Sequence, residues 1–140
     1  MTRNVPVVSV DASLSDVVNL LVTTSQRRVV VVDAADQLAG IITDGDLLQR
    51  SSDDDRSGIL AAFSQRLPLA GRDQIRLGRR TAADVMARNP IAVLPETPLL
   101  EALQRLLQAK IKRLPVVDDA GHVVGLIGRG QILQALAGDV

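Results

Sequence analysis

The sequence RRVVVVDAADQLAGIITDGDLLQ, residues 27–49, returns 85 positions later as KRLPVVDDAGHVVGLIGRGQILQ, residues 112–134. Both stretches carry a basic pair, an apolar run that ends in aspartate, a polar turn and a second apolar run with a glycine. The match continues without a gap when residues 4–50 are aligned with residues 89–135. A duplication of about 47 residues is therefore the organising feature of the chain.

Each copy has the pattern of a β-α-β-β-α unit. A short extended segment, residues 5–10 or 91–94, leads into an amphipathic helix, which opens near Ser13 in the first copy. Two β-branched runs separated by a polar turn then predict a hairpin of buried strands. A closing helix is expected over residues 44–52 in the first copy and residues 129–137 in the second.

The pattern predicts an α/β fold of the α+β type. Neither copy alone can cover its apolar sheet, so we expect two repeats that are related by a pseudo-twofold axis and packed sheet against sheet. The expected boundaries are residues 1–52 for the first repeat, 53–80 for a connecting insert and 81–140 for the second repeat.

The insert has no counterpart in the duplication and is expected to be partly helical, over residues 59–67. Its opening run, residues 53–55, is interpreted as a solvated acidic loop, and its arginines as a solvated connector or a contact with an anionic partner or second subunit. Residues 81–84, TAAD, indicate a capping box that opens one helical turn. Met1 aligns with Met86, so the first copy lacks this turn; we expect a piece of a longer polypeptide, with a native short protein as the alternative.

Composition excludes several classes of function. Sixteen basic and sixteen acidic residues cancel, and Phe63 is the single aromatic residue, so the sequence predicts no nucleic-acid partner. No apolar run approaches the roughly 20 residues that span a bilayer, and no signal segment is present, so we expect no membrane insertion. The absence of cysteine excludes disulfides and Cys-based zinc sites and fits a cytoplasmic location.

The lead-in ADVMARNP, the strand KRLPVVD, the closing segment GIITDGDLL and the tandem duplication together resemble a pair of cystathionine-β-synthase-type (CBS) domains, the Bateman module. The resemblance covers both copies but not the insert. It implies a disk-like pair that often forms homodimers and binds an adenine nucleotide (AMP, ADP or ATP), or S-adenosylmethionine, in clefts between the repeats. It also implies a regulatory role toward an attached or partner enzyme, transporter or channel.

The ligand motif of this family is intact in the first copy as GIITDGD, residues 40–46. A glycine admits close approach to the backbone, a hydroxyl where a strand becomes a helix suits a phosphate, and an acceptor-only carboxylate can take both ribose hydroxyls. The alternative is a helix capping box, and the two roles are compatible. The residues assigned to ligand binding here are Gly40, Ile42, Thr43, Asp44 and Asp46.

The second copy departs from this motif. It reads GLIGRGQ, residues 125–131, so that Gly128 replaces the hydroxyl and Gln131 replaces the carboxylate. We therefore expect one nucleotide site, built on the first copy, and a second cleft that is empty or binds something else. Arg129 is interpreted as a surface arginine, with contact to an anion as the alternative.

Phosphate and base need further partners. Arg28, Lys112 and Arg113 begin the central strands, where the family often places a cation near phosphate, and the alternative is ordinary strand-edge charge. Lys112 and Arg113 are favoured, because the second copy is expected to face the intact motif. Aliphatic walls and backbone amides for the base are expected from the extended N-terminal segment, namely Asn4, Val5, Pro6 and Val7.

Two readings of function remain open: a ligand-sensing regulatory module, and a structural or dimerisation module without a ligand. An enzyme is disfavoured, because the sequence has no nucleophile and base pair, no metal-ligand set and no GxxxxGK[ST] loop. No catalytic residue, catalytic cofactor or metal ligand is therefore assigned. His122 has no partner of the kind that a triad or a metal site requires, and it is interpreted as a surface residue.

Overall fold

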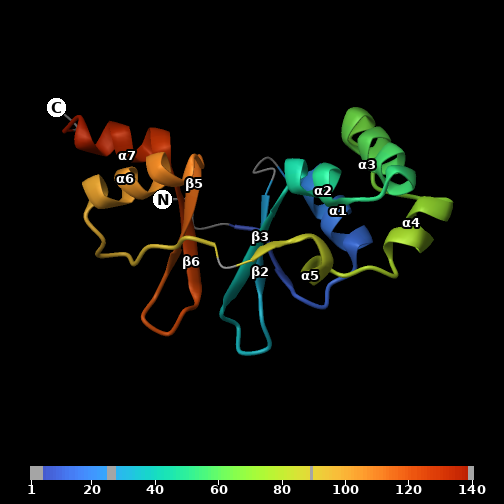
Figure 1. The fold of residues 1–140 in the computed structure, drawn as a ribbon, viewed down its shortest axis with the longest axis horizontal. Helices are drawn as coiled ribbons and strands as arrows, with labels where there is room; N and C mark the ends of the chain where they lie inside the picture. The colour runs from blue at the N-terminus through green and yellow to red at the C-terminus, as the bar shows by residue number, and fades with distance from the viewer. Residues whose placement is uncertain (1–4, 25–27, 89, 139–140) are drawn as a thin grey trace. The chain divides into compact units, whose positions relative to one another are not determined.

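The computed structural model describes residues 5–24, 28–88 and 90–138. The chain divides into two compact units (Figure 1). The N-terminal unit comprises Pro6–Ala35 and Ala39–Asn89, and the C-terminal unit comprises Met1–Val5, Asp36–Leu38 and Pro90–Val140. The insert and the helical turn that follows it therefore group with the first repeat.

The sheet of the N-terminal unit has the strand order β1-β2-β3-β4. β1 (Val7–Ser9) runs parallel to β2 (Arg28–Val32), and β3 (Leu38–Thr43) runs antiparallel to β4 (Ala87–Arg88). The valines of β2 are all buried, as expected for β-branched residues in a covered strand. The two predicted central strands of the first repeat are confirmed.

Helix α1 (Leu14–Thr23) packs on this sheet through its apolar face. The Ser13 hydroxyl accepts a hydrogen bond from the amide of Asp16 over 3.1 Å, so the predicted helix start is confirmed. The 3.6-residue periodicity brings the apolar residues to one side, where they join side chains of β2, β3 and the closing helix α2 (Asp44–Arg50). This core includes Leu14, Val17, Val18, Leu21, Val29, Val31, Ile42 and Leu47.

The insert forms two helices, α3 (Asp53–Gln65) and α4 (Gly71–Leu77), which pack against α1 on the side away from the sheet (Figure 1). The prediction of an acidic loop at residues 53–55 is wrong. These aspartates form the first turn of α3, where Ser52 caps the helix and negative charge is favourable. The helix therefore begins well before residue 59.

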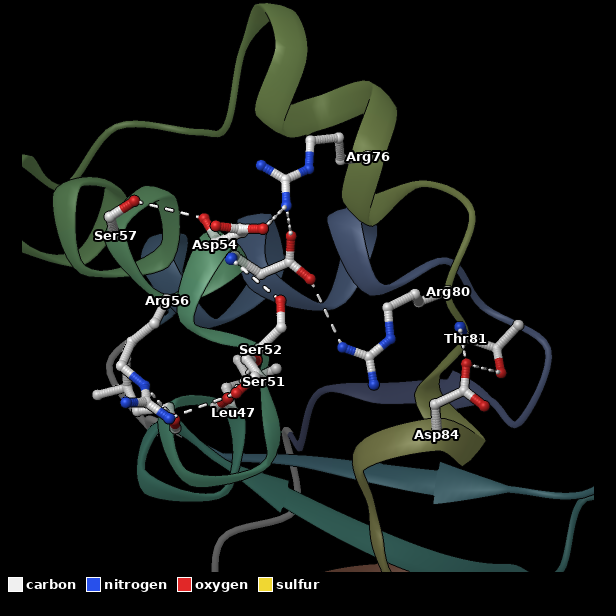
Figure 2. Close-up of polar contacts among 12 residues, drawn as sticks. Leu47, Ser51, Ser52, Asp54, Arg56, Ser57, Arg76, Arg80, Thr81 and Asp84 are labelled. Carbon is white, nitrogen blue, oxygen red and sulfur yellow. Dashed lines mark hydrogen bonds and ion pairs between the residues drawn. The ribbon is translucent and has the colours of Figure 1, made fainter.

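An ionic cluster connects the first turn of α3 with α4 and with the segment that follows α4. The Asp55 side chain is only 11% exposed, and its carboxylate lies 2.9 Å from the Arg76 guanidinium and 3.6 Å from the Arg80 guanidinium. Figure 2 shows Arg76 and Arg80 pointing toward the first turn of α3. These two arginines thus make ion pairs within the fold, which corrects the expectation that they belong to a solvated connector.

The turn after the insert agrees with the sequence. Helix α5 (Ala82–Val85) follows Thr81, whose amide donates to the Asp84 carboxylate over 2.8 Å (Figure 2). The TAAD segment therefore opens one helical turn, as predicted. β4 comes directly after it and adds a short strand to the sheet of the N-terminal unit.

The C-terminal unit contains the hairpin β5 (Arg113–Val117) and β6 (Val123–Gly128), with helices α6 (Leu99–Ala109) and α7 (Arg129–Leu136) side by side against it (Figure 1). The segment predicted to be extended at residues 91–94 makes only an isolated bridge, between Val93 and Val116. The buried core consists of Val93, Ala102, Leu106, Leu114, Val116 and Ile132.

The predicted fold class is confirmed as a mixed α/β structure with two sheets, one in each unit. Packing of one sheet on the other stays a prediction. Within the described ranges, none of the helices has both the length and the apolar character needed to cross a bilayer.

Candidate functional site

Thr43 and Asp46 form a reciprocal pair where β3 ends and α2 begins. The Thr43 hydroxyl accepts a hydrogen bond from the amide of Asp46 over 3.0 Å. In return, Oδ2 of Asp46 accepts from the amide of Thr43 over 3.1 Å. The capping-box interpretation is therefore confirmed for the structure as it stands.

The capping box leaves hydrogen-bonding capacity on both side chains. The Thr43 hydroxyl accepts one bond and keeps its own proton as a donor. Oδ1 of Asp46 accepts no hydrogen bond from the residues that the structure describes. Both residues are half-buried and therefore remain reachable. One donor and one anionic acceptor are thus held at a fixed spacing, without breaking the cap.

The neighbouring motif residues have different surroundings. A Cβ atom at Gly40 would lie 2.7 Å from Sδ of Met86 and 2.8 Å from the carbonyl oxygen of Ala87, so glycine is needed here for the approach of β4. A role for Gly40 in ligand approach stays a prediction. Ile42 is fully buried in the core, and its predicted contact with a ligand stays a prediction.

Asp44 supports the first turn of α2. Its Oδ1 accepts the amide of Gly45 over 2.8 Å, and the residue is half-buried. An acidic side chain at this position is favourable because the first amides of a helix lack partners within the helix. Its second carboxylate oxygen is available to other groups.

The second repeat caps its closing helix differently. The amide of Gly128 donates to Oε1 of Gln131 over 2.9 Å, which reproduces one half of the box that Thr43 and Asp46 form. The side chain of Arg113 lies beside Gly128, and its Cγ is 3.6 Å from the point that a Cβ atom on this glycine would occupy. This end of β6 thus has neither a hydroxyl nor a carboxylate.

The basic candidates lie at the starts of their strands. Arg28 opens β2 and is half-buried, whereas Arg113 opens β5 in the other unit. Lys112 is exposed, and its carbonyl accepts the amide of Arg129 over 2.9 Å. Their predicted contact with phosphate is not tested by these positions and stays a prediction.

The predicted base-binding segment is described from Val5 onward, and Asn4 lies outside the described residues. The carbonyl of Pro6 accepts the amide of Val30 over 2.9 Å, which anchors the segment beside β2. Val7 is 46% exposed, so an aliphatic surface is present on β1.

A turn in the second repeat lowers the pKa of one carboxyl group, that of Asp118. Oδ1 of Asp118 accepts the amides of His122 and Ala120, each over 2.9 Å. The hydrogen bond from His122 is the main cause that lowers the pKa of Asp118 below its ordinary value of 3.8. His122 itself is exposed, as predicted, and its Nδ1 lies 3.5 Å from Oδ2 of Asp118.

Sequence comparison identifies relatives of the whole chain. The CBS domain family matches residues 1–53 and 82–138. The chloroplastic CBS domain-containing protein CBSX2 of Arabidopsis thaliana is 30% identical over 144 residues, which cover 95% of this chain and 59% of that protein. Arabinose 5-phosphate isomerase KpsF of Escherichia coli is 32% identical over 127 residues, 91% of this chain but 33% of the enzyme. The chain thus spans only part of the length of both relatives.

Solved structures give the same assignment. The crystal structure of CBSX2 in complex with AMP has a TM-score of 0.71 at 29% identity, and the match covers 98% of this chain and 92% of that one. The CBS domain of a membrane protein from Sphaerobacter thermophilus has a TM-score of 0.69 at 28% identity, covering 93% and 80%. With both halves of its duplication matched by the family, the chain belongs to the CBS domain family and carries two CBS domains in tandem.

Proposed function

We propose that this CBS pair is a regulatory module that binds an adenine nucleotide through Thr43 and Asp46. The free oxygen of Asp46 would accept the ribose hydroxyls, and the Thr43 hydroxyl would donate to the phosphate. The complex of CBSX2 with AMP supports this ligand class, since that protein is 29% identical to this chain. AMP is therefore the first nucleotide to test, before ADP, ATP and S-adenosylmethionine.

The observation that carries the proposal is the cap of the second repeat. Gln131 caps α7 with a single bond to the amide of Gly128, and no hydroxyl takes part. Helix capping in this fold therefore does not require the Thr and Asp pair of the first repeat. Both side chains of that pair also keep hydrogen-bonding capacity that a ligand could use in place of water.

The remaining contacts follow from the sequence. Arg28, Lys112 and Arg113 would balance phosphate charge. The two arginines offer a planar guanidinium fork that matches phosphate oxygens, and Lys112 offers a compact positive charge. The aliphatic surface of the segment that holds Pro6 and Val7, extended by Asn4 and Val5, would contact the base. We propose no reaction: the nucleotide would stabilise one state of the pair over another and so regulate an attached or partner protein in the cytoplasm.

A thermal unfolding panel tests the proposal. At about 100 times its dissociation constant, a single-site ligand stabilises a fold by roughly 2.7 kcal/mol. We expect at least one of AMP, ADP, ATP and S-adenosylmethionine to raise the midpoint temperature of unfolding by an amount that matches this free energy. The ligand should be recovered unchanged. An unchanged unfolding midpoint with all four ligands contradicts nucleotide sensing. Net hydrolysis of the nucleotide by the pure protein contradicts the proposal that the module is not an enzyme.

An exposed leucine surface favours a second candidate function, a dimerisation scaffold. Leu100 and Leu107 of α6 are 58% and 56% exposed, and Leu133 and Leu136 of α7 are 49% and 43% exposed. Apolar surface of this kind on neighbouring helices is typical of protein interfaces. Sedimentation analysis of the wild type and Leu107→Glu tests it: we expect a homodimer that the substitution dissociates, and a monomeric wild type contradicts it.

A further inference from the structure

A cavity of about 380 Å³ lies in the N-terminal unit, among the end of α1, the start of α2 and the second half of α3. Its apolar walls come from all three helices. We call it the insert pocket, because α3 belongs to the insert. The walls are formed by Leu21, Val22, Leu48, Leu60 and Phe63.

The duplication shows what the insert adds. Val22 and Leu48 correspond to Leu107 and Leu133 of the second repeat, which are 56% and 49% exposed. Val22 and Leu48 are instead half-buried, because α3 packs against α1 and α2. The insert thus turns an open apolar face into a pocket.

The pocket shares Asp44 with the ligand motif of the family but otherwise lies outside it. Four of its lining residues lie on or just after α3, outside the matched segments 1–53 and 82–138. Thr43 and Asp46, the centre of the proposed nucleotide site, do not line it. Phe63, the single aromatic residue of the chain, is one of its walls.

Four polar side chains complete the lining: Thr24, Asp44, Ser64 and Arg66. Oγ1 of Thr24 is buried and has no hydrogen-bond partner in the described structure. A buried hydroxyl of this kind can donate to an acceptor that enters the pocket.

The charged pair of the lining is also incompletely matched. Arg66 follows directly after α3, is exposed, and makes no ion pair among the residues described. Asp44 uses one carboxylate oxygen on the amide of Gly45 and leaves the other unused. The pocket therefore offers one cation, one anion, two hydroxyls and an apolar wall.

We propose that the insert pocket binds a small zwitterion with an apolar side chain, which is the chemistry of an apolar α-amino acid. Its carboxylate would pair with Arg66 and the hydroxyl of Thr24 or Ser64, and its ammonium group with Asp44. Its side chain would pack against Leu60 and Phe63. A ligand with a single charge would use only one of Asp44 and Arg66, and a volume near 380 Å³ suits a small molecule.

Titration calorimetry with L-phenylalanine tests the class of ligand, with 3-phenylpropionate and phenethylamine as probes that lack the ammonium or the carboxylate. We expect saturable binding of phenylalanine and at least about tenfold weaker binding of both analogues, since each leaves one charge unpaired. Absence of saturable phenylalanine binding overturns the proposal. Equal binding of either analogue overturns the assignment of a zwitterion.

Variants locate the site. Arg66 has a φ of 53°, a left-handed conformation that glycine adopts readily, so Arg66→Gly removes the guanidinium with the fold retained. We expect this variant to weaken phenylalanine binding about tenfold. Arg72→Ala, on the exposed surface of α4, is the matched control and should leave binding unchanged. Unchanged affinity in Arg66→Gly contradicts the proposal.

The outcome is independent of the proposed nucleotide function. Asp46→Asn should keep phenylalanine binding, and Arg66→Gly should keep AMP binding. Nuclear magnetic resonance spectra provide the location directly: we expect phenylalanine to shift the amide signals of Leu60, Phe63 and Ser64. Shifts confined to residues outside the insert pocket would refute the assignment.

Discussion

The amide of Gly128 donates to Oε1 of Gln131 at 2.9 Å, whereas in the first repeat the amide of Thr43 donates to a carboxylate oxygen of Asp46 at 3.1 Å. The two repeats therefore keep the same backbone contact with different side chains. An uncharged acceptor is sufficient for it. The charge of Asp46 and the hydroxyl of Thr43 are additions to a helix start that the fold can also make without them.

Thr43→Ala should affect both stability and binding. Loss of the hydroxyl leaves the amide of Asp46 without its acceptor, so we expect the free energy of unfolding to fall by about 1 kcal/mol in urea titrations. We also expect AMP to bind about tenfold more weakly, because a donor to its phosphate is removed.

Ser13→Ala is the matched control for this variant. Ser13 caps α1 through the amide of Asp16 over 3.1 Å and is not part of the proposed site. It should reduce stability by a similar amount, about 1 kcal/mol, and leave AMP affinity unchanged. Equal weakening of AMP binding in both variants would mean that only the loss of stability matters.

Asp55→Ala should destabilise the insert more than Asp54→Ala. The Asp55 carboxylate is 11% exposed and contacts two arginines, whereas that of Asp54 is 86% exposed and lies 3.9 Å from Arg76. We expect losses of about 1–2 kcal/mol for Asp55→Ala and about 0.5 kcal/mol for Asp54→Ala in chemical denaturation. Equal losses would show that the cluster adds nothing beyond favourable charge at the start of α3.

Gly40→Ala should destabilise the sheet. The new Cβ atom would meet Met86 and the carbonyl of Ala87 within 3 Å, and backbone cannot move aside as a side chain does. We expect a loss of about 1–3 kcal/mol by thermal or chemical unfolding. Gly130→Ala, where no atom lies within 4 Å, should be neutral or gain about 0.5 kcal/mol. A tolerated Gly40→Ala would contradict the close approach of β4.

Asp118→Asn should change the pH dependence of stability. The pKa of Asp118 is lowered in the folded protein, mainly by the amide of His122, so the ionised carboxyl stabilises the fold at pH values above its unfolded pKa. This contribution disappears as pH falls through the folded pKa. The stability difference between wild type and Asp118→Asn should therefore shrink between neutral pH and about pH 3.

Asp119→Asn is the control for the pH series, since its carboxylate accepts no hydrogen bond within the described ranges. Urea denaturation at several pH values gives both differences. A difference for Asp118→Asn that stays constant with pH would contradict the role of the Asp118 carboxylate in its turn.

Elements that depend on local signals were predictable from the sequence. The Ser13 cap, the apolar spacing of α1 and the β-branched run of β2 are short-range patterns, and the duplication reinforced the last two. The first turn of α3 was mispredicted although a local signal was present, because a serine followed by acidic residues is itself a helix-start pattern. Asp55 has its partners at Arg76 and Arg80, more than 20 residues away, and sequence periodicity does not report such pairings.

The site was predictable only in part. The motif correctly indicated that Thr43 and Asp46 interact, because a capping box is a local arrangement. The motif could not indicate which of Ile41 and Ile42 is fully buried, since both are apolar strand residues. The structure shows that Ile42 is buried and Ile41 is half-buried. Nor could the motif reveal the insert pocket, because the packing of α3 over Val22 and Leu48 is a tertiary contact without a sequence signal.

The most direct test of the proposed nucleotide site is titration calorimetry of AMP with the wild type and with Asp46→Asn. The side-chain carbonyl of asparagine can still accept the amide of Thr43, as Gln131 accepts that of Gly128, so the cap is kept and only the charge is lost. We predict one AMP per chain for the wild type and at least about tenfold weaker binding for Asp46→Asn, with stability nearly unchanged. Equal affinity of the two proteins, or no binding by the wild type, would contradict the proposed nucleotide site.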